Sequence, residues 1–466
     1  MDTRRILEHP TLAPVLSVTF NDDNSWFAVG LDHGFRSKSP RKPCCLLFDI
    51  INMGQVLMAY AHLVYESGTC NPRPSRNIGS GIGMVQMLGR TNILGLVGGG
   101  RQTNFSRNKL VLWDDKAKKE VGTISASTSV RGAKMSSKRI VLVLKDRVQV
   151  HQTTKPRTLL ATYETADNPL GLCCLSSDRI AFPGRTVGHV QLVEIKTGNV
   201  SIIPAHTSAL RAMALSQDGE LLATASEVGT IIRVFATSNC ARLHELRRGI
   251  DKAIIFSIGF NPSGNYLACT SDKSTLHVFD VPRPGGGGGG GARPTTSNGG
   301  ASTAGEPSMG TGNNRPSSPY SVASSSGYGG GGSVIVNGTN IGGSSDMTAP
   351  DDGGQSRWGF LSKLPGMPRV FTDRYSFASA RFEMADEPVS NGSREPVGTG
   401  TGIIGGPLKG NLGWISETEV VVIGAGRDPK WEKFSVQEGG QQTGYQGGGG
   451  RKLVRVGWKR YGGETP

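Results

Sequence analysis

The sequence lacks several features that mark membrane-spanning, secreted or metal-binding proteins. No apolar run approaches the length that crosses a bilayer, and the first residues, MDTRRILEHPTLAPVL, contain no signal-peptide core. The seven cysteines include the adjacent pairs Cys44-Cys45 and Cys173-Cys174 but no C-x-x-C spacing. These absences predict a cytoplasmic protein in a reducing compartment, without a disulfide framework or a zinc site.

Motifs of enzyme chemistry are also missing. The sequence contains neither G-x-x-x-x-G-K-[ST] nor H-E-x-x-H, and no nucleophile, base and orienting residue recur in a recognisable order. Residues Gly400–Gly405 fit the dinucleotide fingerprint by letters, but they lie in a polar loop without a βαβ unit, before Pro407. We therefore expect a binding protein rather than an enzyme, and no cofactor.

Glycine and positive charge are what the sequence has in excess. Only 36% of the 466 residues are hydrophobic, and 67 are glycine. The excess gathers in residues 282–356, where a composition of Gly, Ser, Thr and Asn cannot bury enough apolar area to offset the entropy of ordering, which predicts a disordered loop. The net charge of +14 favours an anionic partner: nucleic acid, an anionic membrane or an acidic protein.

The rest of the chain repeats a strand-type unit. From the second unit to the sixth, the first apolar runs start 40 to 46 residues apart, which is the period of four-stranded propeller blades. Each run is followed by a polar turn and a second run, as in Ile93–Gly98, Leu221–Ser226 and Tyr266–Ser271. An ordinary β-sandwich is the alternative, but the near-constant spacing favours an all-β, seven-bladed propeller of the WD-repeat type. The seven first runs are Leu16–Phe20, Met84–Leu88, Val130–Met135, Leu170–Leu175, Leu210–Leu215, Ile255–Phe260 and Leu412–Ile415.

This unit structure also places the glycine-rich loop. The loop follows LHVFDV, the third run of the sixth unit, and the strand-like run Tyr375–Phe382 supplies the fourth strand, so the loop is inserted in the sixth blade. We expect four regions: blades one to six (part) in 1–281, the disordered loop in 282–356, a basic aromatic segment in 357–374, and the end of blade six with blade seven and its polar insertions in 375–466.

The sharpest local feature is Leu246-Arg247-Arg248-Gly249, at the end of the fifth unit. In an extended segment, neighbouring side chains point to opposite faces, so Arg247 and Arg248 are expected to serve different surroundings. Each guanidinium presents a planar donor fork that suits a phosphate, and Gly249 permits a turn that a Cβ would hinder. The alternative is a pair of solvated arginines at a strand end. The flanking units favour the phosphate interpretation because they offer histidine, hydroxyl and basic side chains: His206, Ser226, Thr230, Arg233, Thr270, Ser271 and His277.

The order AH, ATAS, GTIIRVF, LRRG resembles the PROPPIN family, also called WIPI-type propellers. Further segments resemble it too, among them NKLVLWDD and AFPGRTVGHVQLV, so the resemblance covers most of the chain outside the insertions. Because leucine precedes RRG, the motif is similar to that of the LRRG-bearing branch of the family. This branch includes the fungal proteins known as the second homologue of the swollen-vacuole phenotype protein.

The resemblance implies a monomeric seven-bladed propeller with two lipid head-group sites on its rim. It implies binding to phosphatidylinositol 3-phosphate and phosphatidylinositol 3,5-bisphosphate, and a role as a peripheral protein on vacuolar, endosomal and pre-autophagosomal membranes. It also implies a protein partner, the large lipid-transfer protein of autophagy. Carried over by position, one site comprises Arg247 with His206, Ser226, Thr230 and Arg233; the other comprises Arg248 with Thr270, Ser271 and His277. Gly249 completes the lipid-binding motif.

The segment after the loop has its own expected role. Residues 357–371 read RWGFLSKLPGMPRVF, in which Arg357, Lys363 and Arg369 lie among apolar and aromatic residues. Such a segment suits a membrane interface, so Trp358, Phe360 and Leu361 are predicted to insert into the membrane. The alternative is that they pack against the blade edge. For the whole chain, the competing function is a WD-repeat protein-interaction scaffold without lipid binding. Nucleic acid is not the expected partner, because basic and aromatic residues interleave only in this segment.

Overall fold

The computed structural model describes residues 15–31, 60–72, 76–77, 81–100, 104–283, 374–383, 410–426, 428–438 and 450–461. The regular elements within these ranges are all strands, β1 to β29. None of the described residues belongs to a helix that is long and apolar enough to cross a membrane. The compact unit that contains these strands comprises residues 1–283 and 353–466.

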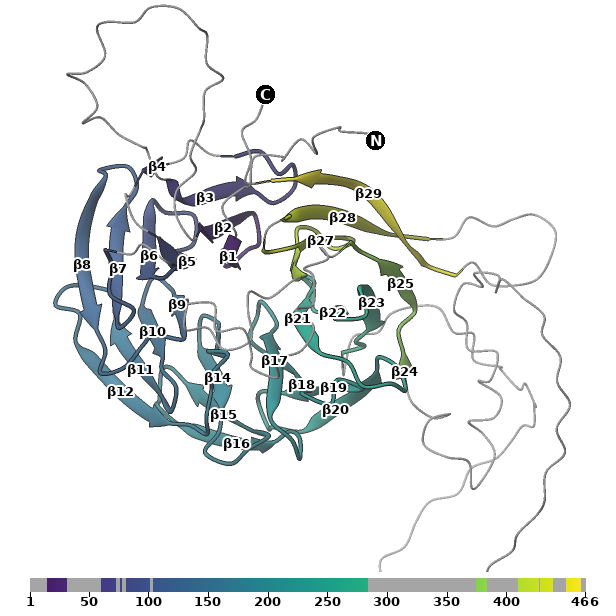
Figure 1. Cartoon of the computed structure of the whole chain (residues 1–466). Coiled ribbons are helices and arrows are strands. Elements are labelled where there is room, and N and C mark those ends of the chain that lie inside the picture. Colours follow the sequence, from purple (N-terminus) through teal and green to yellow (C-terminus); the bar gives the residue numbers. More distant parts are fainter. Residues whose placement is uncertain are drawn as a thin grey trace, which may run out of the picture. The chain divides into compact units, whose positions relative to one another are not determined.

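Seven sheets follow one another around a centre, with the first strand of a blade innermost and its fourth strand at the rim (Figure 1). Blade one holds β1 (Val15–Phe20), β2 (Trp26–Leu31), β3 (Tyr60–Glu66) and β4 (Arg76–Asn77). Blade two holds β5 (Ile82–Met87), β6 (Ile93–Gly98), β7 (Lys109–Asp114) and β8 (Lys119–Ser125). Blade three holds β9 (Gly132–Met135), β10 (Arg139–Val143), β11 (Arg147–Gln152) and β12 (Leu159–Glu164). Blade four holds β13 (Cys174–Leu175), β14 (Arg179–Pro183), β15 (His189–Glu194) and β16 (Val200–Pro204).

The remaining blades carry the features of interest. Blade five holds β17 (Leu210–Leu215), β18 (Leu221–Ser226), β19 (Ile231–Ala236) and β20 (Arg242–Arg247), with β24 (Arg374–Tyr375) added as a fifth strand. Blade six holds β21 (Ile255–Phe260), β22 (Tyr266–Ser271), β23 (Thr275–Asp280) and β25 (Ala378–Arg381). Blade seven holds β26 (Asn411–Trp414), β27 (Glu419–Ile423), β28 (Lys430–Gln437) and β29 (Lys452–Arg460). The prediction of a seven-bladed propeller is confirmed.

The position of the inserted segment is also confirmed, with one correction. β23 and β25 pair with each other in blade six, so the chain between them leaves and returns to the same blade. The run Tyr375–Phe382, however, is not one strand. β24 pairs in parallel with β20 of blade five, and only β25 joins blade six, because the returning chain crosses from the edge of one blade to the edge of the next. The predicted loop and basic segment lie outside the described residues, apart from Pro282, Arg283 and Arg374.

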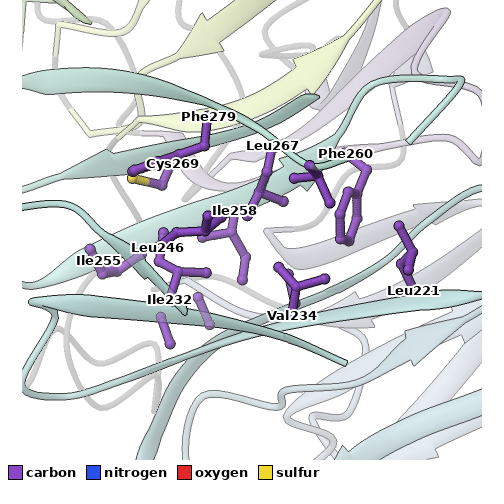
Figure 2. Close-up of a cluster of buried hydrophobic side chains, with 14 residues drawn as sticks. Leu221, Ile232, Val234, Leu246, Ile255, Ile258, Phe260, Leu267, Cys269 and Phe279 are labelled. Atoms are coloured by element: carbon purple, nitrogen blue, oxygen red, sulfur yellow. The ribbon is translucent and has the colours of Figure 1, made fainter. Parts of the chain in front are cut away.

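Side chains from neighbouring blades form the cores. Figure 2 shows the cluster between blades five and six, where Ile232, Val234 and Leu246 of blade five pack against Ile258 and other residues of blade six. A second cluster, between blades four and five, takes Leu222 and Phe235 from blade five. Because side chains alternate along a strand, residues of β18, β19 and β20 face blade four and blade six in turn. This alternation decides which surroundings each candidate residue meets.

Blade seven closes the ring against blade one. The main chains of Val15 and Gly426 exchange two hydrogen bonds of 2.8 and 3.0 Å. Tyr461, just after β29, packs edge-on against Phe27 and Tyr65 of blade one, with ring centroids 5.5 and 5.4 Å away. All four strands of blade seven come from residues 411–460, so no described strand from the start of the chain completes this blade. The contacts between blades one and seven close the ring instead.

Candidate functional site

The arginine pair lies where β20 ends, at the rim of blade five. Leu246 is fully buried in the cluster between blades five and six. Arg247 therefore lies on the opposite face of the strand, toward blade four, with Ile231 paired to it on β19. Arg248 follows the strand two residues after Leu246, on the side of blade six, where burial and then the charge of Arg248 lower the pKa of the His277 imidazole. The two arginines thus meet different blades.

Arg248 is held in place by the main chain. Its side chain is only 8% exposed. Nε donates to the carbonyl of Gly229 at 2.8 Å, and one terminal nitrogen donates to the carbonyl of Asp251 at 2.5 Å. A guanidinium carries five N–H donors, so within the described chain these bonds leave further donors for an anion. A fixed guanidinium with spare donors is a preorganised half of a phosphate site.

His277 stands beside Arg248 in a chain of hydroxyl groups. Its Nε2 lies 3.1 Å from Thr275 Oγ1, which in turn lies 3.3 Å from Ser271 Oγ. Its Nδ1 lies 3.0 Å from Ser376 Oγ. Burial, and then the charge of Arg248, lower the pKa of His277 to about 4. The imidazole is therefore neutral near pH 7, and the hydroxyl protons can turn toward an incoming anion.

A second cluster lies on the face of blade five that is turned toward blade four. Thr224, Arg233 and Glu245 occupy one row across β18, β19 and β20. His206 Nε2 lies 3.0 Å from Thr224 Oγ1. Arg233 donates to the carbonyl of Ala205 at 2.6 Å and to Glu245 at 3.0 Å. Burial, and then the charge of Arg233, lower the pKa of His206 to about 4. Arg247 belongs to this face by alternation, because Glu245 lies two residues before it.

The turn between β18 and β19 connects the two sides. Ser226 is 5% exposed, and its carbonyl accepts a 3.1 Å hydrogen bond from the amide of Gly229. The carbonyl of Thr230 accepts the amide of Arg248 at 2.9 Å. Gly229 has a φ of +68°, and a Cβ there would meet the carbonyl oxygen of Ala253 at 1.7 Å. Ser226 and Thr230, expected to assist Arg247, therefore lie on the turn that also fixes Arg248.

Thr270 lies apart from the other expected residues, and Gly249 follows Arg248 without the turn expected of it. Thr270 precedes Ser271 on β22, so it points to the other face of blade six, where its hydroxyl donates to the carbonyl of Gly410 in blade seven at 2.6 Å. The structure does not bring Thr270 together with His277. The structure does not show the expected need for glycine at position 249: the residue lies in no turn, its φ is not positive, and an added Cβ would meet nothing within 4 Å.

Sequence reasoning missed four side chains of these clusters: Thr224, Glu245, Thr275 and Ser376. Thr224 lies within ATAS, and its pairing with His206 depends on which face of β18 looks toward blade four. Glu245 stands two residues before the arginine pair, a spacing that places it on the face of Arg247. Ser376 carries no local signal, since its partner His277 is 99 positions away.

The returning chain reaches the arginine motif itself. In β24, Arg374 pairs with Leu246 and Tyr375 pairs with Arg247. One terminal nitrogen of Arg374 lies 3.3 Å from His244 Nδ1, and Nε2 of the same histidine lies 2.9 Å from the carbonyl of Pro282. Both ends of the inserted segment therefore contact His244. The residues expected to enter the membrane, Trp358, Phe360 and Leu361, lie outside the described residues.

Comparisons with known proteins agree with this architecture. A family model described as PROPPIN matches residues 100–300. The chain is 77% identical to SVP1-like protein 2 of Neurospora crassa, over 100% of both chains. It is 45% identical to SVP1-like protein 2 of Emericella nidulans, over 80% of this chain and 98% of that one. It is 33% identical to Autophagy-related protein 18 of Dictyostelium discoideum, over 57% of this chain and 65% of that one.

A solved structure shares the fold. Kluyveromyces lactis Hsv2 superposes with a TM-score of 0.59, and the match covers 96% of this chain and 99% of that one. The two sequences are 17% identical in that match. At such an identity, the likeness supports the propeller fold and carries no residue roles.

Proposed function

Because this chain belongs to the PROPPIN family, we propose that it is a phosphoinositide-binding propeller that acts as a peripheral membrane adaptor in autophagy. The relative named Autophagy-related protein 18 supports the process. A family of lipid-binding adaptors is also consistent with a non-enzymatic role.

The observation that carries the proposal is the division of Arg247 and Arg248 between two blade faces. On each face the arginine accompanies a neutral histidine and hydroxyl groups, His206 with Thr224 on one and His277 with Thr275 on the other. A phosphorylated inositol ring needs several directed donors and few apolar walls, and both clusters offer that chemistry. Two linked sites bind a membrane more tightly than either alone.

The preferred lipids in this proposal are phosphatidylinositol 3-phosphate and phosphatidylinositol 3,5-bisphosphate. The membranes are those of the vacuole, endosomes and the pre-autophagosomal site, and the protein partner is the lipid-transfer protein of autophagy. Support for a protein partner comes from a structural relative: KlAtg21 was solved in complex with the coiled coil of AgAtg16. Trp358, Phe360 and Leu361 add apolar attachment once the head groups are bound.

Vesicle flotation tests the proposal directly. We compare the parent protein, Arg247→Thr, and Arg247→Thr with Arg248→Thr on vesicles with and without phosphatidylinositol 3-phosphate. A charged hydrogen bond contributes roughly 1.5–3 kcal/mol, so the single change is expected to weaken binding about ten- to hundred-fold, and the double change to abolish lipid-specific attachment.

The controls separate lipid binding from folding. Because Arg248 also bonds two carbonyls, the fold of each variant is checked by circular dichroism, and Arg248→Lys keeps the charge while losing the planar fork. Unchanged lipid-specific binding by a folded double variant would contradict the proposal and favour a WD-repeat scaffold without lipid binding.

A further inference from the structure

A cavity of about 470 Å³ opens between blades four and five. Its walls come from the connection between β12 and β13, the turn between β14 and β15, and the start of β17, with Glu227 and Ile254 at its border. The volume falls within the range of small-molecule binding pockets. None of the residues that line it is Arg247, Arg248 or His277, so it is distinct from the clusters described above.

The cavity is mainly apolar and partly open. Val187 and Ile254 line it while remaining 54% and 46% exposed. Scattered apolar side chains on a surface need no explanation, but apolar side chains gathered around a cavity indicate a contact surface. Further apolar walls are supplied by Pro169, Leu170, Leu172 and Leu210.

Arg211 is the cationic side chain of this cavity, and a β-bulge sets its direction. β17 pairs Leu210 with Ser226 and then Ala212 with Ala225, so Arg211 is the extra residue. Bulges redirect a side chain and recur beside binding sites. The first strands of three other blades carry the same irregularity, and there the extra residue is uncharged: Leu16, Gly83 and Phe256.

One donor of the Arg211 guanidinium is unsatisfied within the described part of the chain. Its Nε is buried and has no hydrogen-bond partner among the described residues. Burial lowers the pKa of Arg211, and the charge of Asp272 only partly offsets this. A buried donor without a partner is costly in free energy. An acceptor that enters the cavity and bonds this guanidinium therefore contributes more binding free energy than an acceptor in an exposed ion pair.

We propose that this cavity binds a short peptide segment of a partner protein, in which an aliphatic or aromatic side chain stands beside an aspartate or glutamate. The apolar side chain fills the space between Val187 and Ile254. The carboxylate accepts from Arg211. This inference does not rest on the proposed lipid function.

A lipid phosphate fits the cavity less well than a carboxylate. Asp167 and Glu227 are exposed and belong to the lining. Two acidic side chains around one arginine oppose a phosphate dianion and an anionic membrane surface. A single carboxylate on an otherwise apolar segment meets less repulsion and still satisfies the guanidinium.

Selection from a peptide library tests the proposal. A random seven-residue library displayed on phage is panned on the full chain, and a consensus peptide is synthesised with a fluorescent label. We expect a consensus with an acidic residue next to an apolar one. In fluorescence polarisation, Arg211→Gln is expected to weaken its binding about ten- to hundred-fold. Ala209→Phe, which fills the cavity, is expected to abolish it.

Matched variants make the result decisive. Arg139→Gln changes a half-buried arginine of blade three and is expected to leave peptide affinity unchanged. Arg211→Lys keeps the charge and is expected to retain part of it. The proposal is overturned if no consensus emerges, if the consensus lacks an acid, or if binding survives Arg211→Gln. It is also overturned if Arg211→Gln weakens attachment to phosphatidylinositol 3-phosphate vesicles instead, which would assign the cavity to lipid.

Discussion

The hydroxyl of Ser376 lies 3.0 Å from Nδ1 of His277, although 99 positions separate them in the sequence. The inserted segment lies between the two residues. Its return also brings Arg374 and Tyr375 beside Leu246 and Arg247 through β24. The chain that re-enters the propeller therefore pairs with the strand that ends in Arg247 and supplies a hydroxyl to the cluster beside Arg248.

Ser376→Ala is expected to weaken head-group binding on the Arg248 side. The change removes one neutral hydrogen bond to His277, which is worth about 0.5–1.5 kcal/mol, so affinity for soluble inositol 1,3-bisphosphate should fall about two- to twelve-fold. Isothermal titration calorimetry measures this. Ser177→Ala, an exposed serine of blade four, is the control and is expected to bind as the parent does. Equal affinities of parent and Ser376→Ala would remove Ser376 from the site.

Local pattern was sufficient for most of the strands. Three second-strand predictions coincide with β6, β18 and β22, because short runs of apolar and small residues, buried on both faces, lie between clear turns. The strand predicted for Leu170–Leu175 is wrong over its first four residues, since only Cys174–Leu175 forms a strand. There the Asn168 side chain bonds both the amide and the carbonyl of Leu172, and Gly171 adopts a φ of +64°. These bonds bend the chain before it can pair.

The site needed tertiary information that a single sequence lacks. Alternation correctly separated Arg247 from Arg248 onto different faces, and the same rule applied to Thr270 and Ser271 would have separated those two as well. Ser376 lay beyond such reasoning. Its contact depends on where a long insertion re-enters, and loop-closure entropy changes too slowly with length to fix that point.

Arg455→Ala is expected to destabilise the contact between blades six and seven. Glu432 is 2% exposed, and its carboxylate accepts from Arg455 at 3.1 Å and from the amide of Glu383 at 2.6 Å. Loss of the arginine leaves a buried charge with one donor, which should lower the free energy of unfolding by roughly 1–3 kcal/mol. Urea denaturation measures the change. Adding Glu432→Gln removes the charge and should restore part of the loss; an equal loss in both variants contradicts the explanation.

Membrane attachment is expected to need the segment after the glycine-rich loop. Full burial of an apolar side chain contributes roughly 1.5–3 kcal/mol, and less at an interface. Changing Trp358, Phe360 and Leu361 to serine should therefore weaken flotation with phosphatidylinositol 3-phosphate vesicles while soluble head-group affinity stays the same. An equal fall in both measurements would show that these residues support the fold instead.

Acid is expected to destabilise the propeller through His206 and His277. The pKa of each is lowered from 6.5 to about 4, chiefly by burial, so the unfolded chain binds protons that the folded chain does not. Above pH 6.5 both states carry neutral imidazoles, and the free energy of unfolding has its full value. It falls as the pH drops from 6.5 toward 4, because only the unfolded chain takes up these protons. Between pH 7 and 5 the loss in the free energy of unfolding is at most about 2 kcal/mol per histidine.

Urea denaturation at pH 7 and at pH 5 should show a smaller loss for His206→Asn and for His277→Asn than for the parent. His151 and His244, whose pKa values burial also lowers, remain in every variant as an internal reference. An unchanged loss in the double variant would contradict the prediction, since neither imidazole would then carry the difference in bound protons.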